Sequence, residues 1–157
     1  MKNLTVRLLF FVLLFPITCS AEEEVHLALN LWGYSHHAER HKNYNERNWG
    51  FGGRGYYGNW FAAIDDMKNS VRGKAVSVGI GYEYPFFTVS GYTVSAVGEV
   101  SYLRYEFPNK GTMSGTIILP GASIRNGAWS GNVVLIPKTN KRKEIWLFSL
   151  TRHFDAF

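Results

Sequence analysis

Cysteine and charged residues are scarce in this chain. Its 157 residues include one cysteine, Cys19, and 18% are charged. A single cysteine excludes an internal disulfide framework, so another scaffold must stabilise the fold. No stretch shows helical periodicity, and no repeat, linker or low-complexity segment divides the chain. A length of 157 residues predicts one domain.

The first 21 residues have the pattern of a signal peptide. Lys2 and Arg7 form a basic start, and the apolar run LLFFVLLFPIT has the length of a secretory core. Small residues in the stretch CSA predict cleavage after Ala21. The apolar run is too short for an ordinary transmembrane helix. We therefore expect residues 1–21 to be a signal peptide.

Cys19 leaves a second interpretation open, a lipoprotein anchored through this residue. The three residues before it, Pro16 to Thr18, fit a lipobox poorly. Cleavage after Ala21 would remove Cys19 from the mature chain. Residues 22–157 would then be one exported domain without disulfides.

The rest of the chain consists of short runs of alternating apolar and polar residues, separated by turn-forming residues. In the first run, Val25, Leu27, Leu29 and Leu31 share one face, opposite His26, Ala28, Asn30 and Trp32. The stretches YGN and RNGA between later runs are typical of tight turns. The eight runs are Val25–Ser35, Trp49–Tyr56, Trp60–Met67, Ala75–Tyr84, Tyr92–Tyr105, Thr116–Ile124, Trp129–Ile136 and Glu144–Phe154.

Eight antiparallel strands of this length predict a closed up-and-down β-barrel. A soluble lipocalin and a transmembrane barrel both have this strand count. Export without cysteine, aromatic-rich strands and a terminal Phe157 favour the transmembrane form, with the leucine-type face outward. We therefore expect an all-β, eight-stranded transmembrane barrel in the outer membrane.

The basic residues are unevenly placed in this barrel. If the N-terminus lies inside, connections after odd-numbered strands lie outside, and Arg125 marks the opposite rim. A one-sided basic collar suits a surface of phosphorylated lipopolysaccharide. Loops that merely keep the protein soluble are the other explanation, but they would not predict such asymmetry. The outer set contains twelve cations: Arg40, Lys42, Arg47, Lys68, Arg72, Lys74, Arg104, Lys110, Lys138, Lys141, Arg142 and Lys143.

Three other motifs predict little. The stretch GFGGRG, Gly50 to Gly55, fits a dinucleotide-binding pattern but has no strand–turn–helix context, so its glycines are expected to let strands pack closely. His36, His37 and His41 lack the cysteine and carboxylate partners of a metal site, apart from Glu39. No Ser/His/Asp triad follows from spacing alone. We expect no metal and no cofactor.

Four motifs resemble, in order, those of the PagP family of outer-membrane lipid A palmitoyltransferases. They are YNERNWGFG (Tyr44–Gly52), MKNS followed by GIGYE (Met67–Glu83), ILPGASI (Ile118–Ile124) and VLIPKT (Val134–Thr139). The resemblance extends from about Trp32 to Phe154. It implies an eight-stranded barrel that holds an acyl chain and transfers it from a glycerophospholipid to lipid A. The amphipathic N-terminal helix of the family has no room between Ala21 and Val25.

The resemblance also implies catalytic residues. The family's Asp-Ser pair falls on Asn69 and Ser70, so the carboxylate is absent here. The family's His matches His37, with His36 as a rival because alternation places it on the face of Trp32. Aligning Trp32 with the family's Trp would instead put Gly33 at the His position. In acyl transfer, His37 would act as base or proton shuttle, and Ser70 with Asn69 would stabilise the oxyanion or position the ester.

Three further positions carry the family's substrate-binding features. Gly81 matches the glycine at the floor of the acyl pocket, and Pro120 and Pro137 match prolines beside lateral openings. A proline removes a donor from the strand ladder, so hydrogen bonding should be weak there. Simple strand bending is the other role open to Gly79 and Gly81.

The function implied by the resemblance is acyl transfer to lipid A. The alternative is a catalytically silent small outer-membrane barrel with a structural or adhesive role, and a soluble lipocalin-like carrier is a third candidate. The expected partners are lipid A or lipopolysaccharide and phospholipid, and no nucleic acid. We expect a membrane-embedded monomer.

Overall fold

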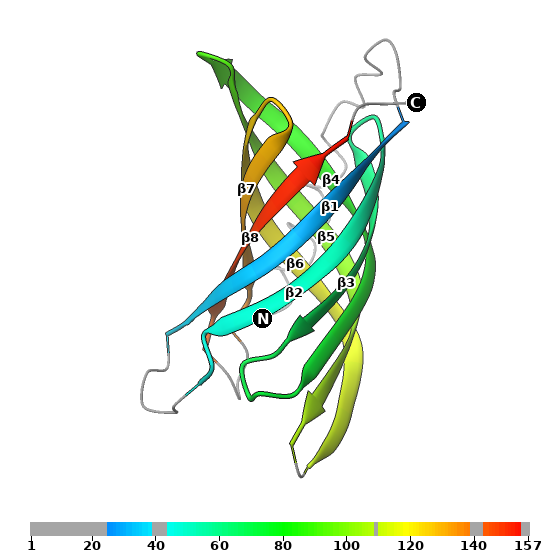
Figure 1. The fold of residues 1–157 in the computed structure, drawn as a ribbon, viewed down its shortest axis with the longest axis vertical. Coiled ribbons are helices and arrows are strands. Elements are labelled where there is room, and N and C mark those ends of the chain that lie inside the picture. Colours follow the sequence, from blue (N-terminus) through cyan, green and yellow to red (C-terminus); the bar gives the residue numbers. More distant parts are fainter. Residues whose placement is uncertain (1–24, 39–43, 109, 139–142, 155–157) are drawn as a thin grey trace, which may run out of the picture.

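The computed structural model describes residues 25–38, 44–108, 110–138 and 143–154, which form one closed β-barrel (Figure 1). In this part of the chain no helix is both long and apolar enough to cross a bilayer. The eight-stranded antiparallel barrel predicted from the sequence is confirmed. Its strands are β1 (Val25–His37), β2 (Arg47–Tyr57), β3 (Trp60–Lys68), β4 (Lys74–Val89), β5 (Tyr92–Phe107), β6 (Gly111–Asn126), β7 (Trp129–Ile136) and β8 (Ile145–His153).

Pairing between the first and last strands closes the barrel. Each strand pairs with the next, and β1 pairs with β8 from Ala28↔His153 to His37↔Ile145. Closure removes the two open edges that an eight-stranded sheet would otherwise present. Because hydrocarbon offers no hydrogen bonds, closure is also what allows a sheet to cross a membrane.

The exterior of the barrel is apolar. Val25, Leu27, Leu29 and Leu31 all point outward, as alternation predicted, while Ala28, Asn30 and Trp32 are buried. Large apolar side chains continue around the outside and include Trp49, Phe51, Ile64, Val78, Ile80, Val100, Ile118 and Leu150. An apolar belt of this extent on a closed barrel is a lipid-facing surface.

The two ends of the barrel differ. The described residues of four connections (38, 44–46, 69–73, 108, 110, 137–138 and 143–144) lie at one end, called here the loop end, at the bottom of Figure 1. Two-residue turns at 58–59, 90–91 and 127–128 lie at the other, the turn end. Of the twelve collar cations, Arg40, Lys42, Lys141 and Arg142 fall outside the described residues. The other eight lie in or beside the loop end.

The strands differ from the predicted runs mainly in length. β4 continues to Val89, so residues 85–89 belong to a strand and the connection is only Ser90 and Gly91. Both turn residues have positive φ, 50° and 81°. Pro85 did not end the strand because a register shift lies between Pro85 and Phe87, where β4 tolerates the missing donor.

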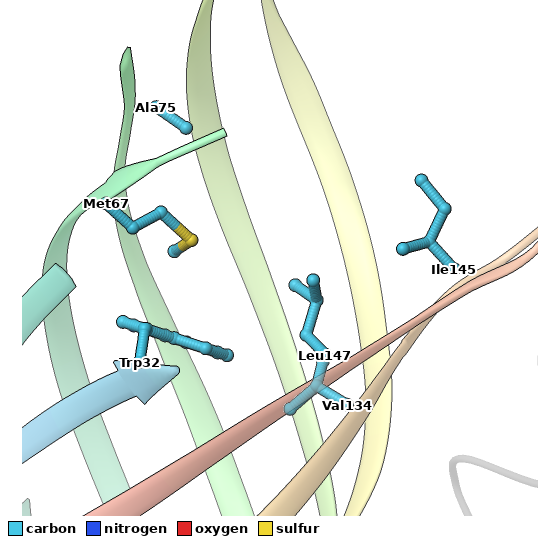
Figure 2. Close-up of a cluster of buried hydrophobic side chains, with 6 residues drawn as sticks. All are labelled: Trp32, Met67, Ala75, Val134, Ile145 and Leu147. Atoms are coloured by element: carbon cyan, nitrogen blue, oxygen red, sulfur yellow. The ribbon is translucent and has the colours of Figure 1, made fainter. Parts of the chain in front are cut away.

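Two groups of buried apolar side chains fill the barrel. The group nearer the loop end brings together Trp32, Met67, Ala75, Val134, Ile145 and Leu147, which project into the interior from opposite walls (Figure 2). The group nearer the turn end consists of Ala28, Tyr56, Phe61, Ala63 and Val97. An eight-stranded barrel has just enough interior for such side chains, so any cavity must come from small or absent ones.

The lipid-facing belt predicts a depth-dependent cost of charge. Ile64 lies at the centre of β3 and is 59% exposed, so Ile64→Arg should lower the free energy of unfolding by about 2–4 kcal/mol. Val89, at the end of β4, is equally exposed, and Val89→Arg should cost about 0–1 kcal/mol. Urea unfolding in phospholipid bilayers measures both. Equal costs at the two positions would show that the belt does not span a bilayer.

Candidate functional site

Polar side chains gather where the interior meets the loop end. His37 at the end of β1, Asn48 near the start of β2, and Asn69 and Ser70 after β3 are all buried. All four line the same interior cavity, together with Tyr44. The structure therefore brings together the three catalytic residues predicted from the sequence.

A hydrogen bond joins His37 and Ser70. His37 Nε2 lies 2.8 Å from Ser70 Oγ, and the two residues are 4% and 7% exposed. The His37 ring stacks on Tyr44, with centroids 4.3 Å apart. The backbone carbonyl of Ser70 accepts a hydrogen bond from the backbone N–H of Asn45 at 2.8 Å. These contacts hold the His37 imidazole against the loop that carries Ser70, residues 69–73, called here the serine loop.

An irregularity at Gly33 decides which histidine faces the cavity. The pairing of β1 with both neighbours shifts register between Trp32 and Tyr34. Inward positions are even-numbered up to Trp32 and odd-numbered from Ser35 to His37. The expectation that His36 shares the face of Trp32 was therefore wrong, because the strand does not alternate strictly across this irregularity.

His36 instead lies on the outer surface beside Glu46. Its Nδ1 is 3.8 Å from Glu46 Oε1, and both side chains are more than a third exposed. The Tyr34 hydroxyl donates to Glu46 Oε2 at 2.9 Å and is the largest cause of the lowered pKa of that carboxyl. An ion pair this exposed contributes little to stability. Of the two rivals, only His37 lies within reach of Ser70.

Asn69 organises the loop between β3 and β4. Its Oδ1 accepts hydrogen bonds from the backbone N–H groups of Val71 (3.1 Å) and Gly73 (2.8 Å). Its Nδ2 donates to the carbonyls of Lys74 (3.0 Å) and Glu106 (2.7 Å). Both amide hydrogens are used, so Asn69 has none to offer an oxyanion. Its place in the site is to hold Ser70 in position.

The same contacts account for Asn at a position where the resembled family has Asp. A carboxylate could accept from two N–H groups but could not donate to two carbonyls. The loop also holds Arg72 at a φ of 67°, a conformation that a non-glycine residue rarely adopts. The asparagine amide therefore matches this loop, which ties β3, β4 and β5 together.

A cavity of about 170 Å³ lies inside the barrel, on the turn-end side of the polar group. Its walls are mostly apolar: Trp32, Met67, Ala75, Leu103, Tyr105, Phe107, Met113, Ile117, Leu119, Val134, Ile136, Ile145 and Leu147. A dry cavity of roughly this size holds a benzene-sized apolar group. The site therefore has a polar mouth at the loop end and an apolar chamber behind it, toward the turn end.

Polar side chains also line the cavity on the side toward the turn end. Asp65 Oδ1 accepts from Trp32 Nε1 at 2.7 Å and from Asn30 Nδ2 at 2.9 Å. Glu99 accepts from Ser101, and both line the cavity with Asp65 and Ser77. We call Asp65, Ser77, Glu99 and Ser101 the polar floor.

Hydrogen bonds continue from Asp65 of the polar floor through the interior toward the turn end. The Thr151 hydroxyl donates to Asn30 Oδ1 at 2.9 Å, and Asn132 Nδ2 donates to Thr151 at 2.8 Å. The Ser130 hydroxyl donates to Asn132 Oδ1 at 3.5 Å, and its Oγ lies 3.0 Å from His153 Nε2, which links His153 to this chain. Paired polar groups of this kind are rigid and close the chamber on its turn-end side.

Gly81 does not line the cavity. It lies on β4 farther from the loop end than Ser77, and a Cβ built on it would collide with the Phe61 ring and the carbonyl of Gly98. It faces inward, as alternation predicted, but it makes room for Phe61. The position of the polar floor rather than Gly81 limits this cavity.

Two of the four glycines of the GFGGRG stretch, Gly50 and Gly52, let strands and side chains pack closely, as expected, whereas Gly53 and Gly55 have room for a Cβ. A Cβ at Gly50 would meet Met67, and one at Gly52 would meet the Asp65 carboxylate. Gly52 thereby leaves space for an acid of the polar floor. No cluster of three or more potential metal-ligating side chains occurs in the described ranges, and His41 lies outside them.

Pro120 and Pro137 lie beside an interrupted ladder. Pairing of β6 with β7 begins at Gly121↔Val134 and runs toward the turn end, so the described residues 111–120 of β6 have no partner on β7. Pro120 immediately precedes this pairing, and Pro137 follows the last residue of β7. The predicted weak hydrogen bonding at these prolines is confirmed. Met113, Ile117, Leu119 and Ile136 line the cavity beside this gap.

Three residues of the site, Ser35, Tyr44 and Asn48, were not predicted. Tyr44 and Asn48 lie within the motif YNERNWGFG, which gave the only available signal. Ser35 occupies an inward position only because of the shift at Gly33. Its hydroxyl donates to Asn48 Oδ1 at 2.5 Å, and its Oγ lies 3.3 Å from His37 Nε2.

No family model and no curated protein matches the chain. Among solved structures, the chain is similar to the Yersinia pestis outer membrane protein Ail in a phospholipid bilayer nanodisc. The two are 11% identical with a TM-score of 0.48, over 85% of this chain and 100% of Ail.

The contacts of Asn69 predict that Asp is a poor substitute there. Asn69→Asp would set a carboxylate against two carbonyls that now accept hydrogen bonds, and should lower the free energy of unfolding by about 1–3 kcal/mol. Asn59→Asp is the control, because Asn59 is exposed and its Nδ2 makes one long contact of 3.3 Å with Tyr82. It should change stability by less than about 0.5 kcal/mol. Unfolding in micelles measures both, and equal stability of the two variants would contradict the loop-holding role.

Proposed function

We propose that this barrel lies in the outer membrane and transfers an acyl chain from a glycerophospholipid to lipid A. The observation that carries the proposal is the His37–Ser70 hydrogen bond at the mouth of an apolar chamber. Such a pair supplies a proton-bearing group and a hydroxyl at one point, beside a space suited to hydrocarbon. The motifs shared with the lipid A palmitoyltransferase family support the same chemistry.

The reaction needs little from the protein beyond these groups. The acceptor hydroxyl oxygen bonds to the ester carbonyl carbon while the bond to the glycerol oxygen breaks. The proton lost by the acceptor is balanced by one gained by the glycerol oxygen, so acylated lipid A and a lysophospholipid result. In this proposal the His37–Ser70 pair moves or holds the proton and donates to the developing oxyanion. Asn69 positions Ser70.

The surroundings of the site suit lipid substrates. The gap between β6 and β7 offers a route from the membrane into the cavity that crosses no strand ladder. Arg72 lies in the serine loop itself, and the other cations of the loop end would face the phosphate groups of lipid A. In this proposal the loop end of the barrel faces outward.

A catalytically silent outer-membrane barrel with a structural or adhesive role is the second candidate. It is favoured by Asn69, which removes the family's carboxylate and commits both amide hydrogens to the loop. Asp65 of the polar floor is likewise held by Asn30 and, through it, Thr151, and this arrangement needs no substrate to explain it. The two candidates share the membrane barrel and differ only in turnover.

Mass spectrometry of lipid A separates the candidates. The purified barrel, with phospholipid donor and lipid A acceptor, should give acylated lipid A and lysophospholipid. Ser70→Ala and His37→Asn should each slow transfer by about 10²–10⁴-fold, the usual contribution of a positioned proton-transfer group. His36→Asn is the matched control and should retain the wild-type rate. No transfer by a folded wild-type barrel would favour the silent candidate.

The cavity predicts which residues set acyl selectivity. Ser77 is buried in the polar floor, so Ser77→Leu should fill the turn-end side of the chamber. Each methylene excluded from an apolar site forfeits about 0.8 kcal/mol, so the preferred chain should shorten by a few carbons.

Gly81→Ala is the control for this change. Its Cβ meets Phe61 outside the cavity, so it should destabilise the barrel without altering selectivity. The measurement is the distribution of chain lengths transferred from a mixed donor pool. A shift with Gly81→Ala but not with Ser77→Leu would place the floor at Gly81.

A further inference from the structure

The hydrogen bonds around Ser35 determine where its proton lies. Asn48 Nδ2 donates to the carbonyl of Lys68 at 2.9 Å, which fixes the orientation of the amide and turns Oδ1 toward Ser35. The Ser35 hydroxyl therefore donates to Asn48 Oδ1, at 2.5 Å. Ser35 is fully buried and Asn48 is 3% exposed, so water does not compete for this bond. The single hydroxyl proton of Ser35 is committed to Asn48.

This commitment limits what Ser35 can offer His37. Ser35 Oγ lies 3.3 Å from His37 Nε2 and presents only lone pairs to it. A bare Nε2 would face those lone pairs with its own, whereas an Nε2–H would donate to them. The same Nε2–H can be shared with Ser70 Oγ at 2.8 Å.

We propose that Ser35 and Asn48 are positioning residues that hold a proton on His37 Nε2. His37 then donates to Ser70 Oγ, and the Ser70 hydroxyl proton is left for the carbonyl oxygen of a bound ester. This assigns Ser70 as the oxyanion donor and His37 as the group that polarises it. The assignment of roles rests on the proposed acyl transfer, but the position of the proton does not.

Nitrogen NMR of the histidine rings tests the proton position directly. The probe is the intact barrel with ¹⁵N-labelled histidine in phospholipid nanodiscs, at a pH where His37 is neutral, with its signals identified by their loss in His37→Asn. Wild-type Nε2 should have a pyrrole-like, protonated shift. In Ser35→Ala and in Asn48→Ala it should move toward the pyridine-like, unprotonated shift. Ser35→Ala removes the acceptor, and Asn48→Ala frees the Ser35 hydroxyl to donate to Nε2.

A second histidine, His153 near the turn end, supplies a matched control. Ser130 Oγ lies 3.0 Å from Nε2 of His153, so Ser130→Ala should alter the His153 signals and leave those of His37 unchanged. A pyridine-like Nε2 in the wild type would overturn the proposal. An Nε2 shift that is the same in the wild type, Ser35→Ala and Asn48→Ala would also overturn it.

Kinetics separate this inference from the proposed function. With transfer established, Ser35→Ala should lower kcat more than it raises KM, and Ser35→Thr, which keeps the hydroxyl, should recover part of the rate. A wild-type kcat in Ser35→Ala would overturn the positioning role while leaving acyl transfer intact. No transfer by any variant, together with the expected NMR shifts, would refute the function and keep the proton assignment.

Discussion

Pairing of β1 with β8 is the constraint on which the rest of the molecule depends. Once the ladder closes, each side chain must face either lipid or a narrow interior. Apolar residues cover the outside without difficulty. Every polar side chain that faces inward needs a partner, because little water reaches it. The hydrogen-bonded series from Asp65 to His153 is the consequence, and it limits the space left for a ligand.

The candidate site lies where this regular pairing and alternation are interrupted. The shift at Gly33 turns Ser35 and His37 inward, and the serine loop between β3 and β4 meets them from across the mouth. Between β6 and β7 the ladder stops at Gly121, beside the cavity. The barrel thus combines a rigid turn-end half with a loop-end half that is open on one side. That combination suits a substrate that enters from the membrane and reacts at its surface.

The period-two pattern predicted most of the fold because it reports directly on inward and outward faces. All eight strands, and the outward leucine face of β1, followed from it. It failed at His36, since one irregular residue reverses every later position in the strand. Strands β1 to β6 were longer than predicted, whereas β7 has the predicted bounds and β8 is shorter. In β4 the additional residues 85–89 begin at Pro85, which interrupts the alternation on which the prediction rested.

Resemblance to a family located Ser70 and His37 but could not give their surroundings. The role of Asn69 depends on carbonyls of Lys74 and Glu106, which come together only through the paired strands. The polar floor likewise joins Asp65 on β3 with Glu99 on β5, and no spacing along the chain indicates that they meet. Gly81 faces inward as predicted but lies outside the cavity, because the Phe61 ring of the neighbouring strand β3 occupies the space beside it.

Photolabelling tests most directly whether an acyl chain occupies the interior. The probe is a phospholipid with a diazirine near the methyl end of one acyl chain, in bilayers that contain the barrel. Labels should fall on wall residues such as Met67 and Leu147, and an excess of unlabelled phospholipid should suppress them. Labelling confined to outward residues such as Ile64 and Ile80 would mean that lipid surrounds the barrel and does not enter it.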